Sequence, residues 1–131
     1  MLKKIKVEFA DGKKLSATGD GFTTGTDLPV EKGGEGSAPS PVDLFITSLA
    51  TCAAYYARNF CDSKAITMNG IALNVEYVQD PDTSHISKVN YLLTLPEGFP
   101  EKYKAAMLRT IDLCPVKKHL INPPAFELEL I

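Results

Sequence analysis

The two residues with the most reactive chemistry in this 131-residue chain are Cys52 and Cys114. A thiolate can attack a peroxide to give a sulfenic acid, and a second thiol nearby then condenses with that acid to form a disulfide. Two cysteines whose sulfurs meet in a sheltered pocket would provide both steps. A redox interpretation therefore requires that folding brings the sulfurs of residues 52 and 114 within bonding reach.

Cys114 directly precedes Pro115, which disfavours helical geometry at the cysteine and predicts that a helix begins there. At such an N-cap a thiolate is stabilised by the helix dipole and by free backbone N–H groups, and residues 117–119 add positive charge nearby. Cys52 is expected in the middle of a helix, where it gains nothing from a helix terminus. Local electrostatics thus favours Cys114 as the thiol of lower pKa, although these residues alone do not decide which cysteine attacks first.

Cys52 lies within the segment 44–57, which contains no charged residue. A helix that is uncharged around its whole circumference is expected to be buried on all sides. Because so small a domain can hardly surround a helix of about five turns, we expect a central helix that a second subunit partly covers. A lone buried cysteine would ordinarily be structural, and the presence of Cys114 is what favours a redox role.

The remaining candidate residues are more simply explained as structural. Cys61 follows Cys52 by nine positions, so an intact helix places the two thiols on opposite faces and about 13.5 Å apart along its axis, too far for a disulfide. Tyr55 and Tyr56 could line a pocket beside Cys52, but aromatic residues of a buried helix more often belong to the core. His85 is expected in an exposed turn. No metal site is predicted, because the available ligands lack zinc-type spacing: Cys52, Cys61, Cys114, His85 and His119.

Composition indicates a soluble globular protein with one domain over residues 1–131, since 44% of the residues are hydrophobic and 23% are charged. The net charge of −2 comes from well-mixed signs, which argues against nucleic acid as a partner because phosphate binding needs clustered Lys and Arg. No signal peptide is visible, and the longest uncharged stretch is too short to cross a membrane. Three cysteines are too few for a secreted disulfide framework, so we expect a cytoplasmic protein with reduced thiols.

The predicted elements follow the order ββ–α–ββ–α–α–β, which is typical of an α+β fold. Alternating apolar and polar residues predict strands at 5–9, 14–18, 71–78, 88–95 and 126–130, the first of them half-buried. Helices are predicted at 41–60, 100–113 and 115–121, the first opened by Ser40 as N-cap with Asp43 in the capping-box position. Residues 20–29 are expected to be irregular, with room for one short strand, and residues 33–39 to form a flexible loop.

The combination of motifs resembles the OsmC/Ohr family along nearly the whole chain. The matching motifs are the glycines Gly33, Gly34 and Gly36, the helix start Ser40-Pro41-Val42-Asp43-Leu44-Phe45, the segment Ser48-Leu49-Ala50-Thr51-Cys52, and Cys114-Pro115-Val116. Either cysteine motif alone would be weak, whereas the combination is fairly specific.

The resemblance implies an entwined homodimer in which antiparallel sheets wrap around central helices, with two active sites near the subunit interface. It implies that Cys52 is the peroxidatic thiol and Cys114 the resolving thiol, that organic hydroperoxides are the substrates, and that a dithiol such as a dihydrolipoyl group is the reductant. No metal or bound cofactor is implied. This assignment reverses the ranking from local electrostatics, and we follow it because a cation from elsewhere in the fold could activate Cys52.

The chain departs from the best-studied peroxidases of that family at the residues that activate the thiolate. Those enzymes use an arginine from the N-terminal strands, whereas the first arginine here is Arg58. They also place a glutamate directly after the helix-opening proline, where this chain has Val42, with Asp43 turned about 100° away. Four cations could substitute: Arg58, Arg109, Lys117 and Lys118. The alternative function is an OsmC-like module without peroxidase activity that binds a small apolar or electrophilic ligand at the dimer interface.

Overall fold

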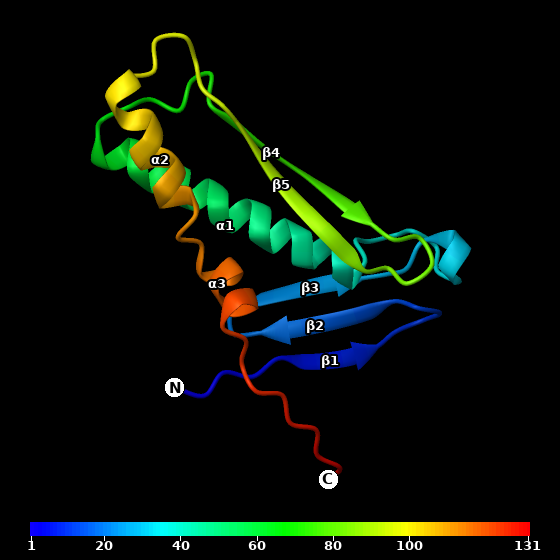
Figure 1. Ribbon diagram of the computed structural model, residues 1–131. Coiled ribbons are helices and arrows are strands. Elements are labelled where there is room, and N and C mark those ends of the chain that lie inside the picture. The colour runs from blue at the N-terminus through cyan, green and yellow to red at the C-terminus, as the bar shows by residue number, and fades with distance from the viewer. The chain divides into compact units, whose positions relative to one another are not determined.

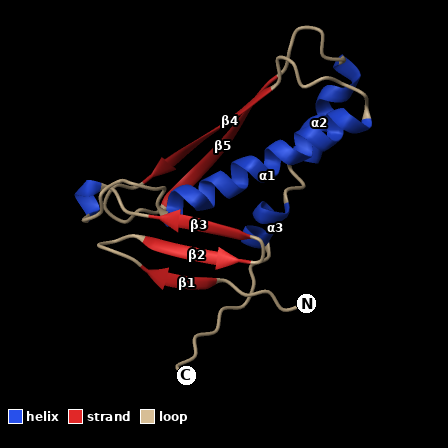
Figure 2. Ribbon diagram, turned by 180° about the vertical axis from the view of Figure 1, so that it is seen from behind, coloured by secondary structure: helices blue, strands red, loops and turns tan.

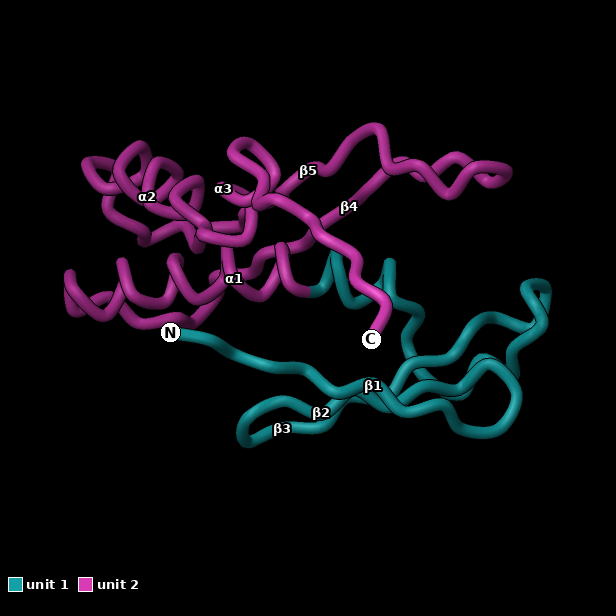
Figure 3. The backbone as a smooth tube through the Cα atoms, turned by 90° about the horizontal axis from the view of Figure 1, so that it is seen from below, with its two compact units in different colours: residues 1–47 teal, residues 48–131 magenta.

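The computed structural model describes residues 1–131, which form two compact units, residues 1–47 and residues 48–131 (Figure 3). The first unit holds a three-stranded antiparallel sheet, and the second holds a two-stranded hairpin and most of the helical structure (Figure 1). The boundary falls within the long helix α1 (Pro41–Ser63). Antiparallel strands and helices occupy separate stretches of the chain, which confirms the predicted α+β class.

The sheet of the first unit has the strand order β1–β2–β3: β1 (Lys6–Phe9), β2 (Leu15–Gly19) and β3 (Phe22–Thr26). The turn between β1 and β2 is built on the predicted hairpin residues, with the Lys14 N–H donating to the Asp11 carbonyl over 3.1 Å and Gly12 at a φ of +62°. β3 occupies the region in which one short strand was expected. The prediction of a half-buried first strand is wrong, because Val7 and Phe9 lie exposed and a sheet face stays open to solvent unless another layer packs on it.

The loop between β3 and α1 is organised by the carboxylate of Asp27, whose residue is only 1% exposed. This carboxylate accepts hydrogen bonds from the N–H groups of Leu28 (2.8 Å), Glu35 (3.2 Å) and Ser37 (3.1 Å), and from the Ser37 hydroxyl (2.6 Å). Gly34 fits here because an added Cβ would lie 1.9 Å from the Leu28 carbonyl oxygen. The loop expected to be flexible is therefore tied down by one acidic side chain, and these bonds lower the pKa of Asp27 to about 2.

Helix α1 begins with the capping box that the sequence predicts. The Ser40 hydroxyl accepts from the Asp43 N–H over 3.1 Å, and the Asp43 carboxylate accepts from the Ser40 N–H over 2.9 Å. The helix continues three residues beyond the predicted end, because no residue leaves helical geometry before Ala65, whose φ is +54°. The Ile66 N–H then bonds to the Cys61 carbonyl and closes the helix end.

The second unit contains the hairpin β4 (Ala72–Gln79) and β5 (Ile86–Thr94), the 3₁₀ turn η2 (Glu101–Tyr103), and the helices α2 (Lys104–Ile111) and α3 (Pro115–Ile121) (Figure 2). Both strands lie within two residues of their predicted positions, and α3 has the predicted bounds. The helix predicted at 100–113 is shorter than expected. Its first turn is 3₁₀, with the Tyr103 N–H bonded to the Pro100 carbonyl, and a further turn at Leu113 precedes the proline that starts α3.

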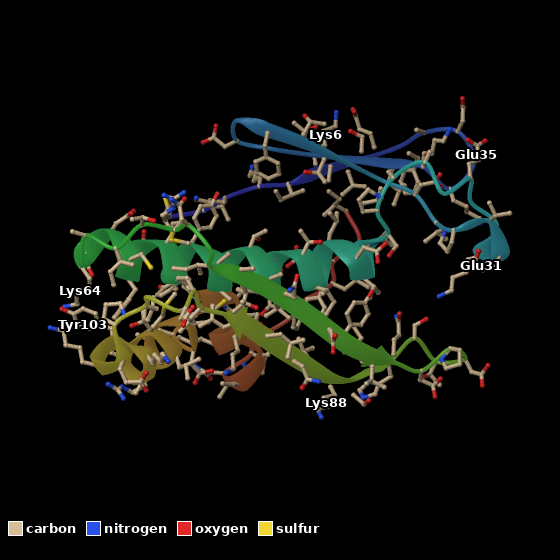
Figure 4. The ribbon with its side chains drawn as sticks, turned by 90° about the horizontal axis from the view of Figure 1, so that it is seen from above. Lys6, Glu31, Glu35, Lys64, Lys88 and Tyr103 are labelled. Carbon is tan, nitrogen blue, oxygen red and sulfur yellow. The ribbon has the colours of Figure 1, made fainter.

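The core of the second unit joins α1 to α2 and to the hairpin. Its buried residues are Ala53, Ala57, Phe60, Cys61, Phe99, Met107 and Ile111, and the half-buried Tyr91 and Leu93 of β5 pack against them. The Phe60 ring meets the Tyr103 ring edge-on, with centroids 5.9 Å apart. The Lys64 ammonium lies over the Tyr103 ring, 5.5 Å from the ring centroid (Figure 4). This cluster fixes the part of α1 that carries Cys52.

Within one chain, helix α1 is covered on one face and exposed on another: Thr51, Ala54 and Tyr55 are exposed, Tyr55 by 69%. This agrees with the expectation that so small a domain cannot surround the helix by itself. The predicted strand at 126–130 does not form, and Leu128 and Leu130 are fully exposed. A strand needs a neighbour for its backbone groups, and the sheet of this unit contains only β4 and β5. None of the helices combines the length and the hydropathy that crossing a membrane would require.

Replacing Asp27 with Asn should lower stability at neutral pH, because an amide offers one acceptor oxygen where the carboxylate offers two. The folded-state pKa of Asp27 is depressed to about 2 from 3.8. Its stabilising effect is therefore complete above about pH 4 and is lost as the pH falls through about 2. The difference in free energy of unfolding between wild type and Asp27→Asn, measured by urea denaturation, should shrink from pH 7 towards pH 2.5.

The matched control is Asp20→Asn, in the exposed turn between β2 and β3. This variant should unfold like the wild type across the same pH range. A difference for Asp27→Asn that stays constant down to pH 2.5 would contradict the role given to this carboxylate.

Candidate functional site

Cys52 of α1 and Cys114, which joins α2 to α3, lie near each other in the second unit, and the Cys114 thiol acts as a hydrogen-bond partner on the pKa of Cys52. All three cysteines of the chain are free thiols. Cys52 is half-buried, whereas Cys114 is only 2% exposed. The contact that the sequence analysis required between these two sulfurs is therefore present, and it lies within one compact unit.

The N-terminus of α3 acts on the thiol of Cys52, although Cys114 is the residue at its N-cap. Cys114 is the N-cap of α3 and Pro115 its first helical residue, as predicted, but the Cys114 side chain makes no capping hydrogen bond. The backbone N–H of Val116 instead donates to the sulfur of Cys52. The expectation that a mid-helix Cys52 gains nothing from a helix terminus is wrong, because the free N–H belongs to a helix that packs across it.

The balance of these effects keeps Cys52 in its thiol form near neutral pH. Burial raises the pKa of Cys52 above its ordinary value, and the hydrogen bond to Cys114 raises this pKa further. The Val116 N–H favours the thiolate and lowers the pKa in part. Cys52 is thus a protected thiol whose thiolate fraction grows as the pH rises.

A cavity of about 340 Å³ opens beside Cys114. Leu108 and Ile111 of α2 form apolar wall, and Arg109 and Lys117 bring positive charge to the same space. Such a mixture of apolar walls and a few polar groups is typical of sites that bind small organic molecules. Cys114 therefore lies beside a cavity whose walls suit a small organic ligand.

Tyr91 of β5 and Asp112 complete the lining of this cavity. Burial, followed by the charges of Cys114, Cys52 and Asp112, raises the pKa of the Tyr91 phenol above its ordinary value. Tyr91 therefore keeps its phenolic proton near neutral pH. The sequence analysis missed this residue, because alternating apolar residues in a strand are typical of a face that packs on the core, and Tyr91 fits that pattern.

The four cations proposed as substitutes for the missing arginine are found in different surroundings. Arg109 and Lys117 line the cavity, and the Lys117 ammonium is ion-paired with Asp112. Arg58 acts on the thiol of Cys61, whose pKa its charge lowers. Lys118 lies at a separate shallow hollow beside α3.

The other cysteine and the histidines behave as structural residues. Cys61 is 0% exposed within the core cluster, and burial raises its pKa, as expected of a packing residue. His85 is exposed at the end of the hairpin turn. His119 Nδ1 lies 2.6 Å from the Pro115 carbonyl oxygen, within the same helix. No three His, Cys, Asp or Glu side chains converge as a metal site would require.

Comparison with known proteins gives a consistent group of matches. The family model described as OsmC-like protein matches residues 34–129. A solved structure from Psychrobacter arcticus, named for osmotic stress and detoxification responses, shares 28% identity at a TM-score of 0.76, covering 90% of this chain and 88% of that chain. The organic hydroperoxide resistance protein OsmC of Legionella pneumophila shares 18% identity at 0.60, with coverages of 92% and 89%. The organic hydroperoxide resistance protein OhrB of Bacillus subtilis shares 16% identity at a TM-score of 0.52, and the match covers 91% of this chain and 90% of that chain. No curated protein matches the chain.

Replacing Cys114 with Ala should make Cys52 react faster with iodoacetamide at pH 7. The variant loses the hydrogen bond that favours the Cys52 thiol, so the pKa of Cys52 falls and its thiolate fraction rises. In the wild type, alkylation of Cys52 should quicken about tenfold per pH unit between pH 6 and pH 8, because the raised pKa lies above this range. Quenched samples digested and analysed by mass spectrometry give the rate at each cysteine.

The matched control is Leu113→Ala, which shortens the exposed side chain that precedes Cys114. It tests whether a smaller side chain in this turn changes the access of the reagent by itself. Leu113→Ala should leave Cys52 alkylation unchanged. If Cys114→Ala slows the reaction, the hydrogen bond does not govern the pKa of Cys52.

Proposed function

The chain belongs to the OsmC-like protein family, and on that premise we propose that it is a thiol peroxidase that reduces organic hydroperoxides through Cys52 and Cys114. The observation that carries this proposal is the hydrogen bond between the two thiols beside a cavity with apolar walls. Two solved structures with this fold are named for organic hydroperoxide resistance, which agrees with the same chemistry.

Cys52 is the attacking thiol in this proposal. Its side chain is more exposed than that of Cys114, and its sulfur receives the Val116 N–H, which stabilises the thiolate. The Cys52 thiolate attacks the distal peroxide oxygen, so an S–O bond forms as the O–O bond breaks, and the sulfenic acid and an alcohol result. Cys114 then attacks the sulfenic sulfur, giving the disulfide and water. Because the two thiols lie near each other in one unit, this second step takes place within a single chain.

The catalytic cycle closes when an external dithiol reduces the disulfide. Exchange proceeds through a mixed disulfide, in which the attacking thiolate of the reductant bonds to one protein sulfur and releases the other. A dihydrolipoyl group or a similar dithiol has two thiols in one molecule and can complete the exchange without a second collision. The free state of all three cysteines agrees with a cytoplasmic protein that is kept reduced between cycles.

A homodimer is the assembly we assign to this function. The uncharged face of α1 at Thr51, Ala54 and Tyr55 is open to solvent in the single chain. The C-terminal residues Phe126 and Leu128 are likewise exposed. Exposed apolar surface of this kind is typical of interfaces, and a second copy of the chain would cover it.

The alternative function, binding of a small apolar or electrophilic ligand without turnover, is favoured by the raised pKa of Cys52. A thiol that stays protonated protects itself from oxidation, and the cavity beside Cys114 has the walls of a ligand site. The two functions differ in what an organic hydroperoxide does to the thiols, and the next experiment separates them.

Mixing the reduced protein with cumene hydroperoxide should consume two thiols per chain and form a Cys52–Cys114 disulfide. Rapid-quench thiol titration gives the rate, and peptide mapping identifies the bridge. Cys52→Ser should abolish the fast reaction, and Cys114→Ser should stop at a sulfenic acid that dimedone traps. Cys61→Ala, away from the thiol pair, should keep the fast rate. Slow, non-saturating oxidation without a bridge would favour the binding function.

Sedimentation equilibrium should give twice the mass of the chain for the wild type. Ala54→Arg, on the exposed face of α1, should shift the protein towards the monomer because a buried unpaired charge is costly at an interface. The matched control is Lys88→Arg, at an exposed position of β5, which keeps the charge of that residue. This variant should remain dimeric. A wild-type protein that stays monomeric at high concentration would refute the assembly.

A further inference from the structure

Cleavage of an alkyl hydroperoxide by a thiol produces an alkoxide, which is a strong base and a poor leaving group. Protonation of this oxygen as the O–O bond breaks lowers the barrier, and a positioned side chain that supplies the proton accelerates such steps about 10²–10⁴-fold. The cavity beside Cys114 is partly closed to water, so the donor should be one of its lining side chains.

Besides the Cys114 thiol, whose proton the proposed cycle uses in a later step, the cavity offers three side chains with hydrogens to donate. Arg109 carries a guanidinium group, which serves as a fixed charge rather than as an acid. Lys117 is held by its ion pair with Asp112. Tyr91 remains. It lines the cavity with a neutral O–H group, which the Lys117–Asp112 ion pair does not involve.

The structure brings Tyr91 to the thiol pair through the packing of the hairpin. Tyr91 stands opposite Val75 in the β4–β5 ladder and packs against the core cluster that includes Ala53, the residue next to Cys52. It shares the wall of the cavity with Cys114. The charged and titratable groups that act on its phenol are Cys114, Cys52 and Asp112, so its hydroxyl lies in the electrostatic field of both sulfurs.

We propose that Tyr91 is the general acid of this site, donating its phenolic proton to the alkoxide that leaves when Cys52 attacks an organic hydroperoxide. This assignment rests on the proposed function. It adds a catalytic residue that contributes neither a thiol nor a fixed charge.

Atoms and electrons balance over the two chemical steps. In the first, the Cys52 thiolate bonds to the distal oxygen, which keeps its hydrogen, and the departing alkoxide takes the Tyr91 proton to become the alcohol. The phenolate then takes the proton of the Cys114 thiol, which creates the second nucleophile. In the second step, the Cys114 thiolate attacks the sulfenic sulfur, and the released hydroxide takes the proton back from Tyr91 to leave as water. Tyr91 ends as a phenolate that solvent reprotonates, because its pKa lies above its ordinary value.

The sequence of steps requires a phenol that carries its proton when Cys52 attacks. Burial and the nearby sulfur charges raise the pKa of Tyr91 above its ordinary value, so the phenol is neutral near pH 7. A phenol nevertheless is a far stronger acid than an aliphatic alcohol, so proton transfer to the alkoxide runs downhill. The group is therefore in the required protonation state at the start of each cycle.

The test compares Tyr91→Phe with two oxidants that differ in their leaving groups. tert-Butyl hydroperoxide releases an alkoxide, which needs a proton, whereas peracetic acid releases acetate, which does not. Because the chain contains no Trp, Cys52 oxidation is followed by rapid quenching with N-ethylmaleimide and mass spectrometry. Tyr91→Phe should slow the reaction with tert-butyl hydroperoxide about 10²-fold and should leave the reaction with peracetic acid nearly unchanged.

Tyr77→Phe is the matched control, since Tyr77 lies on the neighbouring strand β4, opposite Val89, and is more exposed. It should react like the wild type with both oxidants. Iodoacetamide alkylation of Cys52 in Tyr91→Phe, measured across pH 6–9, should also match the wild type, because a general acid for the leaving group does not act on the free thiol.

Equal losses with the two oxidants, or slower alkylation of Cys52, would assign Tyr91 to the packing or ionisation of the thiol and would overturn the inference. An unchanged rate with tert-butyl hydroperoxide would overturn it as well. A wild type that oxidises slowly with both oxidants, with no disulfide formed, would refute the peroxidase function itself, and that outcome is separable from any effect of Tyr91→Phe.

Discussion

The meeting of Cys52 with the start of α3 is the interaction on which the rest of this site depends. Pro115 begins α3 directly after Cys114, so one short turn presents both a second thiol and the free N–H of Val116 to the sulfur of Cys52. The Cys114 thiol and the Val116 N–H are both hydrogen-bond partners of Cys52, and together they link this turn to α1. Every chemical role discussed for this protein requires that the turn stays seated on α1.

The same arrangement buries Cys114 and partly buries Cys52, which disfavours the charged thiolate. Burial raises the pKa of Cys52, and a single backbone N–H offsets only part of this effect. The thiolate fraction of Cys52 is therefore small. The cavity lined by Cys114 and Tyr91 is partly open to solvent. In the proposed function, an organic ligand in the cavity would lie next to the phenol of Tyr91.

The surrounding packing explains why the pair can be placed so closely. Small residues on the buried face of α1, Ala53 and Ala57, let Met107 and Ile111 of α2 approach the helix, and Cys61 fills the same cluster. Because a close-packed cluster tolerates little displacement, the end of α2 and the turn that follows it are held in place. The position of Cys114 therefore derives from the α1–α2 contact rather than from the cysteine itself.

Much of this molecule follows from short-range rules that can be read along the chain. The capping box of Ser40 and Asp43, the Asp11-Gly12 turn, and the break at Cys114-Pro115 all depend on neighbours within a few residues, and each forms as predicted. The motifs that carry the family resemblance are equally local, and the family that they indicate is confirmed by the family model over residues 34–129. Tertiary structure decided the points at which a group selects a distant partner. It gave the N–H of Val116 to Cys52, brought Tyr91 to the thiols, and tied residues 28–37 to Asp27. It also left the alternating residues 126–130 without a strand to pair with. Hydrogen bonding and burial of this kind depend on which surfaces meet in space, and residue spacing along one segment carries no record of that choice.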